Sequence, residues 1–227
     1  MNNRNRKFIV WDWNGTLQDD FSVAFAATNL NMREIGKPEV DANTYRECFD
    51  VPIEKLYRNL GLTEEEIDRH LKPLQDSFFD TYDKLVKEVD FREGGRDTLN
   101  LAIQHGILQV ILSNHLTEAI DKDLRRLKKL ETFHTILAWP SREKQFVQPK
   151  GNLLPKYIND NNLEPENGII VGDSPEEVKI AREYGLTSVA ISGGYNSLSI
   201  LEKAKPDYII SSLTEMEDIL IERGFIK

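Results

Sequence analysis

Three groups of polar residues stand directly behind short apolar runs of the sequence, and a lysine stands in a loop ahead of the third run. The residues are Asp12, Asn14 and Thr16 after 7–11, Ser113 and Asn114 after 107–112, Asp173, Ser174 and Glu177 after 168–171, and Lys150 in the loop. Carboxylates can hold a cation, while hydroxyl and ammonium groups can hold an anion. Together they would suit a reaction on a negatively charged group.

These residue types fit a magnesium ion and a phosphate group. Two aspartates and a backbone carbonyl match the oxygen ligands of Mg²⁺, which takes few protein ligands and keeps several waters. The hydroxyl of Ser113, the neighbouring amides and the ammonium of Lys150 can hold phosphate oxygens. An aspartate can also attack phosphorus to form an aspartyl-phosphate, and a cation reduces the repulsion between the two anions. The sequence therefore predicts a metal and phosphate site.

Short apolar runs alternate with helical patterns through most of the chain. The predicted strands are 7–11, 107–112, 135–138, 168–171, 188–191 and 208–210, with helices between them that include 116–130, 153–159 and 175–184. This alternation predicts an α/β fold with a doubly wound, Rossmann-like parallel sheet. Ligands of such sheets bind at the carboxyl ends of the strands, so the polar groups should converge there.

Residues 21–90 interrupt the alternation, because they show helical periodicity and almost no strand-like run. Within this segment, Thr63 to Glu66 has the spacing of a capping box that opens a helix. We therefore expect a small helical cap over 21–90. It would be inserted after the first strand of a core formed by residues 1–20 and 91–227.

The composition is that of an acidic globular protein. Lys and Arg total 29 against 38 Asp and Glu, which gives the 227-residue chain a net charge of −9. Such a chain repels nucleic acids and anionic membranes, so we expect neither as a partner. The single cysteine, Cys48, excludes an internal disulfide and a cysteine-rich zinc site. No apolar run reaches membrane-spanning length, so we expect a cytoplasmic protein, and the oligomeric state stays open.

The polar groups also resemble a known family. The segments Asp12-Trp-Asn-Gly-Thr-Leu17, Ser113-Asn114, Lys150 and Gly172-Asp-Ser-Pro-Glu-Glu177 look like the four sequence motifs of the haloacid dehalogenase-like hydrolases, in the same order. The helical insertion resembles the cap of the subclass that contains phosphoglycolate phosphatase-like enzymes. Each motif is weak by itself, but four in order behind strands are specific. The resemblance implies a Mg²⁺-dependent phosphatase that acts on a small phosphorylated metabolite through an aspartyl-phosphate.

The resemblance assigns the nucleophile and the metal ligands. It implies that Asp12 attacks the phosphorus and also binds Mg²⁺. Asn14 would bind the metal through its backbone carbonyl, and Asp173 would complete the protein ligands.

The resemblance also assigns the groups around the phosphate. Ser113 would donate to the phosphoryl group, with Thr16 and Asn114 beside it in the substrate-binding set. Lys150 would neutralise charge between nucleophile and phosphate, and we favour it over Lys144 because of its distance from Asp173. Glu177 would hold Lys150 or a metal-bound water, supported by Ser174.

One position departs from the family pattern. The phosphatases usually carry aspartate where this chain has Asn14, and that aspartate protonates the leaving group and then deprotonates the attacking water. An amide cannot titrate, and general acid–base catalysis is typically worth roughly 10²–10⁴ in rate. Asn14 therefore predicts a slower phosphatase, or one specialised for a good leaving group such as an acyl phosphate.

Other interpretations remain open at this stage. The chain could be a phosphotransferase, a dehalogenase-type enzyme, or a weakened phosphate-binding or regulatory module. The first and fourth motifs also have purely structural explanations, because Asn14-Gly15 is a common turn and Ser174 before Pro175 is a good helix start. Ser113-Asn114 could likewise cap the helix that follows.

Overall fold

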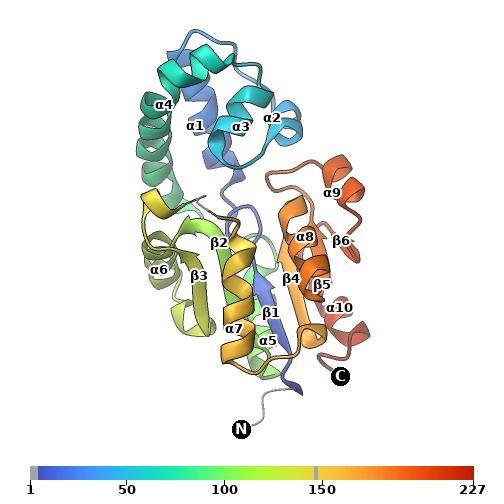
Figure 1. Ribbon diagram of the computed structural model, residues 1–227. Coiled ribbons are helices and arrows are strands. Elements are labelled where there is room, and N and C mark those ends of the chain that lie inside the picture. The colour runs from blue at the N-terminus through green and yellow to red at the C-terminus, as the bar shows by residue number, and fades with distance from the viewer. Residues whose placement is uncertain (1–4, 146–147) are drawn as a thin grey trace.

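The computed structural model describes residues 5–145 and 148–227, so the first four residues of the predicted core lie outside the described part. Six parallel strands form one sheet in the order β3-β2-β1-β4-β5-β6 (Figure 1). The strands are β1 Phe8–Trp11, β2 Leu108–Leu116, β3 Thr135–Trp139, β4 Gly168–Gly172, β5 Thr187–Ile191 and β6 Tyr208–Ile210. The predicted α/β fold with a doubly wound parallel sheet is confirmed.

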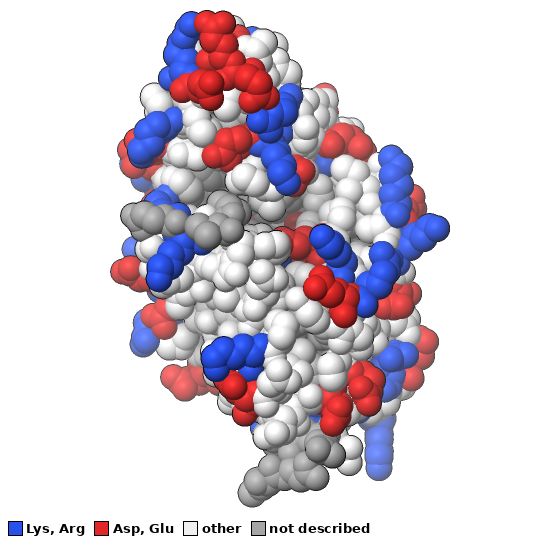
Figure 2. Space-filling model, viewed as in Figure 1, with Lys and Arg blue, Asp and Glu red and all other residues white. Residues whose placement is uncertain are grey.

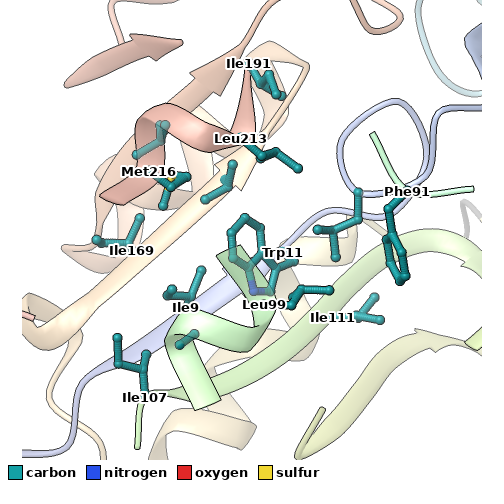
Figure 3. Close-up of a cluster of buried hydrophobic side chains, with 14 of the residues drawn as sticks. Ile9, Trp11, Phe91, Leu99, Ile107, Ile111, Ile169, Ile191, Leu213 and Met216 are labelled. Carbon is teal, nitrogen blue, oxygen red and sulfur yellow. The ribbon is translucent and has the colours of Figure 1, made fainter. Parts of the chain in front are cut away.

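Helices cover both faces of this sheet. The helices that follow β1 along the core are α5 Gly95–Gln104, α6 Thr117–Arg126, α7 Leu154–Asp160, α8 Pro175–Tyr184, α9 Leu198–Ala204 and α10 Met216–Glu222. On one face, Ile9 and Trp11 of β1 pack with residues of α5, α6 and α10 (Figure 3). On the other face, Phe8 and Val10 pack with residues of α7 and α8. Successive residues of β1 therefore face opposite cores, which explains why the run is apolar throughout.

The segment between β1 and α5 is helical and lies beyond the carboxyl edge of the sheet (Figure 1). Its helices are α1 Phe21–Glu34, α2 Ala42–Cys48, α3 Ile53–Asn59 and α4 Glu64–Leu85. The predicted capping box at the start of α4 is present, because Thr63 and Glu66 bond to each other's backbone N–H groups. We propose that these helices form the cap domain of residues 21–90.

One strand and one helix differ from their predicted bounds by more than one residue at an end. Strand β2 runs to Leu116 instead of ending at residue 112, and α6 ends at Arg126 instead of residue 130. The pairing of β2 with β3 shifts register between Leu112 and Leu116, where Leu116 pairs with Trp139. The predicted end of β2 was wrong because the residues of this bulge are polar and resemble a loop in the sequence. Only the pairing with β3 shows that the strand continues beyond the bulge.

Charged side chains of both signs are interspersed over the face that Figure 2 shows. Mixing of both signs is typical of the solvated surface of a globular domain. None of the helices in the described part of the chain has the length and apolar character that crossing a membrane requires.

Candidate active site

The polar groups meet at the carboxyl edge of the three central strands. Strand β1 lies between β2 and β4, and its last residue, Trp11, is in register with Ile111 and Val171. Asp12 directly follows Trp11, whereas Ser113 and Asp173 lie two positions after Ile111 and Val171. The parallel register therefore brings to one place three residues that are far apart in sequence.

The loop after Asp12 is a tight turn that also forms part of the site. The carbonyl of Trp13 accepts hydrogen bonds from the backbone N–H groups of Leu17 and Gln18, at 3.0 and 2.9 Å. Gly15 has a φ of +70°, and a Cβ atom there would lie 2.2 Å from Asp173 Oδ2. Glycine is needed at this position for both reasons. The Asn-Gly turn is thus real, and it packs directly against a predicted metal ligand.

Asp12 lies in an enclosed position with polar partners on both carboxylate oxygens. Its Oδ1 is 2.6 Å from Lys150 Nζ, and its Oδ2 accepts a hydrogen bond of 3.1 Å from Thr16 Oγ1. Burial raises the pKa of Asp12 to about 7, against the opposing effect of Lys150. A cation near this carboxylate would favour its ionised form.

Lys150 connects two carboxylates and is almost fully buried, with a relative exposure of 3%. Its Nζ is 2.5 Å from Glu177 Oε1 as well as 2.6 Å from Asp12 Oδ1. Burial opposes the charge on Lys150, but Asp12 and Glu177 outweigh it and raise the lysine pKa well above its ordinary value. The rival residue Lys144 is exposed. The geometry therefore favours Lys150 over Lys144.

The two carboxylate oxygens of Glu177 have different partners in this structure. Together with Ser174 it forms the capping box of α8, in which Glu177 Oε2 accepts from the N–H and the hydroxyl of Ser174. Its other oxygen faces Lys150. The helix-start interpretation of Ser174 is therefore confirmed, and the same cap holds Glu177 beside the lysine.

Asp173 is the second buried carboxylate of the site. Its Oδ2 accepts a hydrogen bond of 2.6 Å from the backbone N–H of Tyr195, and its Oδ1 accepts one of 3.4 Å from Thr16 Oγ1. Burial raises the pKa of Asp173 well above its ordinary value, and the nearby charge of Asp12 raises it further. The single hydroxyl proton of Thr16 is thus within hydrogen-bond distance of both aspartates.

The donor set fits magnesium. Two carboxylates that share one hydroxyl donor and repel each other would be relieved by a divalent cation between them. Within residues 5–145 and 148–227, no group of three or more His, Cys, Asp or Glu side chains is arranged to hold a metal ion. Asp12, Asp173 and the Asn14 carbonyl could serve as the protein ligands, and water would complete the shell, as Mg²⁺ prefers.

Ser113 and Asn114 lie in the bulge of β2 and do not cap α6, whose N-cap residue is Leu116. Ser113 is 1% exposed, and its hydroxyl accepts from the backbone N–H of His115 at 3.0 Å. The Asn114 side chain donates to Glu176 Oε2 at 2.8 Å. The alternative that this pair caps the next helix is wrong, because the strand continues past both residues.

Asn14 is held by a residue that the sequence analysis did not select. Its amide nitrogen donates to Asp20 Oδ2 at 2.7 Å and to the hydroxyl of Tyr82 at 2.8 Å. Asp20 also accepts from the hydroxyl of Tyr195 at 2.9 Å. The carboxylate six residues after Asn14 was a visible signal for Asp20, but nothing in the sequence pointed to the two tyrosines.

Comparisons with known proteins show the family of this chain. Residues 9–191 match the haloacid dehalogenase-like hydrolase family. The chain is 24% identical over 208 residues to a phosphoglycolate phosphatase of Synechococcus elongatus, covering 92% of this chain and 94% of that protein. It is 22% identical over 212 residues to a pyrophosphatase of Halalkalibacterium halodurans, covering 93% and 95% of the two chains.

A solved structure shares the fold. It is a haloacid dehalogenase-like hydrolase of Streptococcus pneumoniae that superposes with a TM-score of 0.79 at 22% identity, covering 95% of this chain and 99% of that one. The family match spans all four sequence motifs, from β1 to β5. The chain belongs to the haloacid dehalogenase-like hydrolases.

Proposed function

We propose that this protein is a Mg²⁺-dependent phosphatase of small phosphate monoesters or acyl phosphates, with Asp12 as the nucleophile. The observation that carries the proposal is the position of Asp12 between Lys150 and Thr16, with Asp173 sharing the same threonine hydroxyl. The names of the relatives, which include phosphoglycolate phosphatase and pyrophosphatase, support phosphate chemistry.

In the first half-reaction, a carboxylate oxygen of Asp12 attacks phosphorus while the bond to the leaving oxygen breaks. Lys150 stabilises negative charge between nucleophile and phosphoryl group, and Glu177 keeps the lysine charged and in place. Ser113 and its neighbouring amides would hold phosphoryl oxygens. Bound Mg²⁺ would supply charge neutralisation at Asp12, Asp173 and the Asn14 carbonyl.

In the second half-reaction, water attacks phosphorus, the bond between phosphorus and Asp12 breaks, and the carboxylate of Asp12 is regenerated. The proton of the water leaves with the phosphate or to solvent. Asn14 cannot take the proton of this water, because an amide does not titrate near neutral pH. Loss of a general base costs roughly 10²–10⁴ in rate, so hydrolysis of the intermediate should limit turnover.

The cap has to move for substrate to enter. Asp12, Lys150 and Asp173 are exposed by only 7%, 3% and 4%, and Tyr82 of cap helix α4 contacts the Asn14 amide. A closed cap would exclude bulk water from the reaction, which strengthens the electrostatic interactions within the site.

The test is phosphate release from a panel of phosphorylated metabolites, pyrophosphate and one acyl phosphate. Each assay is run with Mg²⁺ and with chelator, and Asp12→Asn serves as the blank. We expect turnover that requires both Mg²⁺ and Asp12. Release of phosphate at an equal rate by the Asp12→Asn protein would contradict the proposal.

A phosphotransferase is the second candidate, favoured by the fixed, non-titrating amide of Asn14. Slow hydrolysis would prolong the aspartyl-phosphate and leave time for a second hydroxyl to take the phosphoryl group. Adding alcohols to the assay separates the two, because a transferase forms a new phosphate ester in place of free phosphate.

A further inference from the structure

Asp20 is a buried carboxylate that the proposed reaction does not use. It is fully buried and lies between the turn after β1 and the start of α1, where core and cap join. Its Oδ1 accepts a hydrogen bond of 2.7 Å from the backbone N–H of Gly15. Its Oδ2 accepts from the amide of Asn14 and from the hydroxyls of Tyr82 and Tyr195. Four donors therefore converge on one buried carboxylate and supply hydrogen bonds to both of its oxygens.

This arrangement determines which end of the Asn14 amide meets Asp20. The Asp20 oxygens accept from all four of these partners, so Oδ2 meets the NH₂ end of the Asn14 amide and not its oxygen. The Asn14 nitrogen also donates to the hydroxyl of Tyr82, which in turn donates to Asp20. The Asn14 oxygen has no hydrogen-bond partner among residues 5–145 and 148–227, and it is therefore free to accept from a water or a hydroxyl.

We propose that Asp20 is the positioning residue for Asn14: it holds the amide with its oxygen toward the phosphoryl site, and it does so when the cap helix α4 brings Tyr82 into contact. This inference rests on the proposed phosphatase function. In that reaction, the amide oxygen orients the attacking water by accepting one of its O–H groups, without taking the proton. An amide turned the other way would present N–H donors to the water and orient it wrongly.

The contacts of Asp20 come from three separate parts of the chain. Asn14 and Gly15 belong to the first loop of the core, Tyr82 to cap helix α4, and Tyr195 to the loop after β5. Tyr195 also donates its backbone N–H to Asp173 at 2.6 Å. The complete set therefore requires α4 to lie against the first loop of the core, and it links the position of α4 to the orientation of Asn14.

The direct test measures hydrogen exchange of the Asn14 side-chain amide by NMR in the Mg²⁺-loaded protein. The resonance is assigned by its loss in Asn14→Asp. We expect exchange to become at least about tenfold faster in Asp20→Asn and in Tyr82→Phe. The first variant replaces the carboxylate that accepts from the Asn14 amide, and the second removes the hydroxyl that accepts from it. Tyr45→Phe is the matched control, since Tyr45 is a fully buried tyrosine of the same aromatic cluster, and we expect no change there.

The kinetic test uses the same Asp20→Asn change in two backgrounds. In the wild-type background it places an amide against an amide, and we expect kcat to fall at least about tenfold with KM within about threefold. In the Asn14→Asp background, Asp20→Asn places an amide donor at position 20 against a carboxylate acceptor at position 14. The same change should therefore cost much less there, or raise kcat. An equal or larger loss in the second background would overturn the proposal.

These two tests separate the failure of this inference from the failure of the proposed function. The exchange measurement needs no turnover, so it stays decisive if no phosphate ester is hydrolysed. Unchanged exchange in a folded Asp20→Asn protein overturns the inference even if the protein proves to be a phosphatase. If Asp20→Asn does not fold, Tyr82→Phe decides in its place, because it removes only a hydroxyl.

Discussion

Lys150 Nζ lies 2.6 Å from Asp12 Oδ1, although 138 residues separate the two in the chain. Both groups are almost completely buried, and Glu177 is the second partner of the lysine. One ammonium therefore serves two carboxylates in an environment with little water. Such a charge is expensive to bury, which points to a use in the reaction as well as in the fold.

Removing the Lys150 charge should damage both stability and catalysis. Lys150→Ala leaves Asp12 and Glu177 buried without a cation, and breaking a buried pair in this way typically costs about 3–5 kcal/mol of unfolding free energy. Loss of one group that stabilises the transition-state charge should lower kcat by about 10²–10³. Denaturant titration and phosphate release measure the two effects. Lys144→Ala, at the exposed rival lysine, is the control, and an equal effect there would contradict the assignment.

Gly194 should control the affinity for magnesium through Asp173. A Cβ atom at Gly194 would lie 2.1 Å from Asp173 Oδ2, so Gly194→Ala must displace this carboxylate. We expect Mg²⁺ binding to weaken roughly 10–100-fold, as for other changes behind a metal ligand. Calorimetric titration with MgCl₂ measures the affinity. Gly36→Ala is the control for backbone strain, because its φ of +71° disfavours alanine while its Cβ atom would meet open space and no metal ligand. Similar weakening there would show that the effect does not act through Asp173.

His115 should make the fold less stable in mild acid. Its ring lies edge-on to Tyr82, and burial lowers its pKa to about 4 against the opposing charges of Asp123 and Asp83. The folded protein therefore disfavours the protonated ring. The unfolded chain binds a proton as the pH falls through 6.5, so stability that is fully present above 6.5 is lost progressively down to pH 4.

The His115→Gln variant removes this loss. Between pH 6.5 and 4, we expect its unfolding free energy to fall less than that of the wild type, by on the order of 2 kcal/mol. Denaturant titration at several pH values checks the slope. His105→Gln, at the exposed end of α5, is the matched control. Parallel pH profiles for His115→Gln and the wild type would refute the prediction.

Thr63 should stabilise the cap through the start of α4. Its hydroxyl accepts from the N–H of Glu66, while the Glu66 carboxylate accepts from the N–H of Thr63. Thr63→Ala should cost about 1 kcal/mol of stability, the usual value for an N-cap. Hydrogen exchange of the first turn of α4 measures the change locally. Thr63→Ser keeps the hydroxyl and should behave like the wild type, whereas an equal loss in both variants would point to another cause.

Acid should weaken the same helix start. The hydrogen bond from Lys37, together with the Thr63 N–H, lowers the pKa of Glu66 to about 2. The stabilising effect of Glu66 is therefore complete above its unfolded pKa near 4.5 and is lost as the pH falls toward 2. In Glu66→Gln, exchange in the first turn of α4 should lose this pH dependence. A dependence as strong as in the wild type would contradict the assignment to Glu66.

The sequence alone determined the elements whose signals are local. The apolar run 8–11 predicts a buried strand, and the spacings of Thr63 with Glu66 and of Ser174 with Pro175 predict helix starts, because these contacts form within one turn. The polar groups at the strand ends could be selected for the same reason. Their type and their position after an apolar run are visible without any long-range contact.

Only the tertiary structure decided which distant groups meet. Strand β2 continues past Ser113 because Leu116 pairs with Trp139, a partner that no local pattern indicates. Asp20 has the sequence appearance of an ordinary acidic residue before a helix. It becomes part of the site because Tyr82 of α4 and Tyr195 of the loop after β5 both contact it. Burial and long-range hydrogen bonding create these roles, and both arise from packing between elements that local periodicity does not specify.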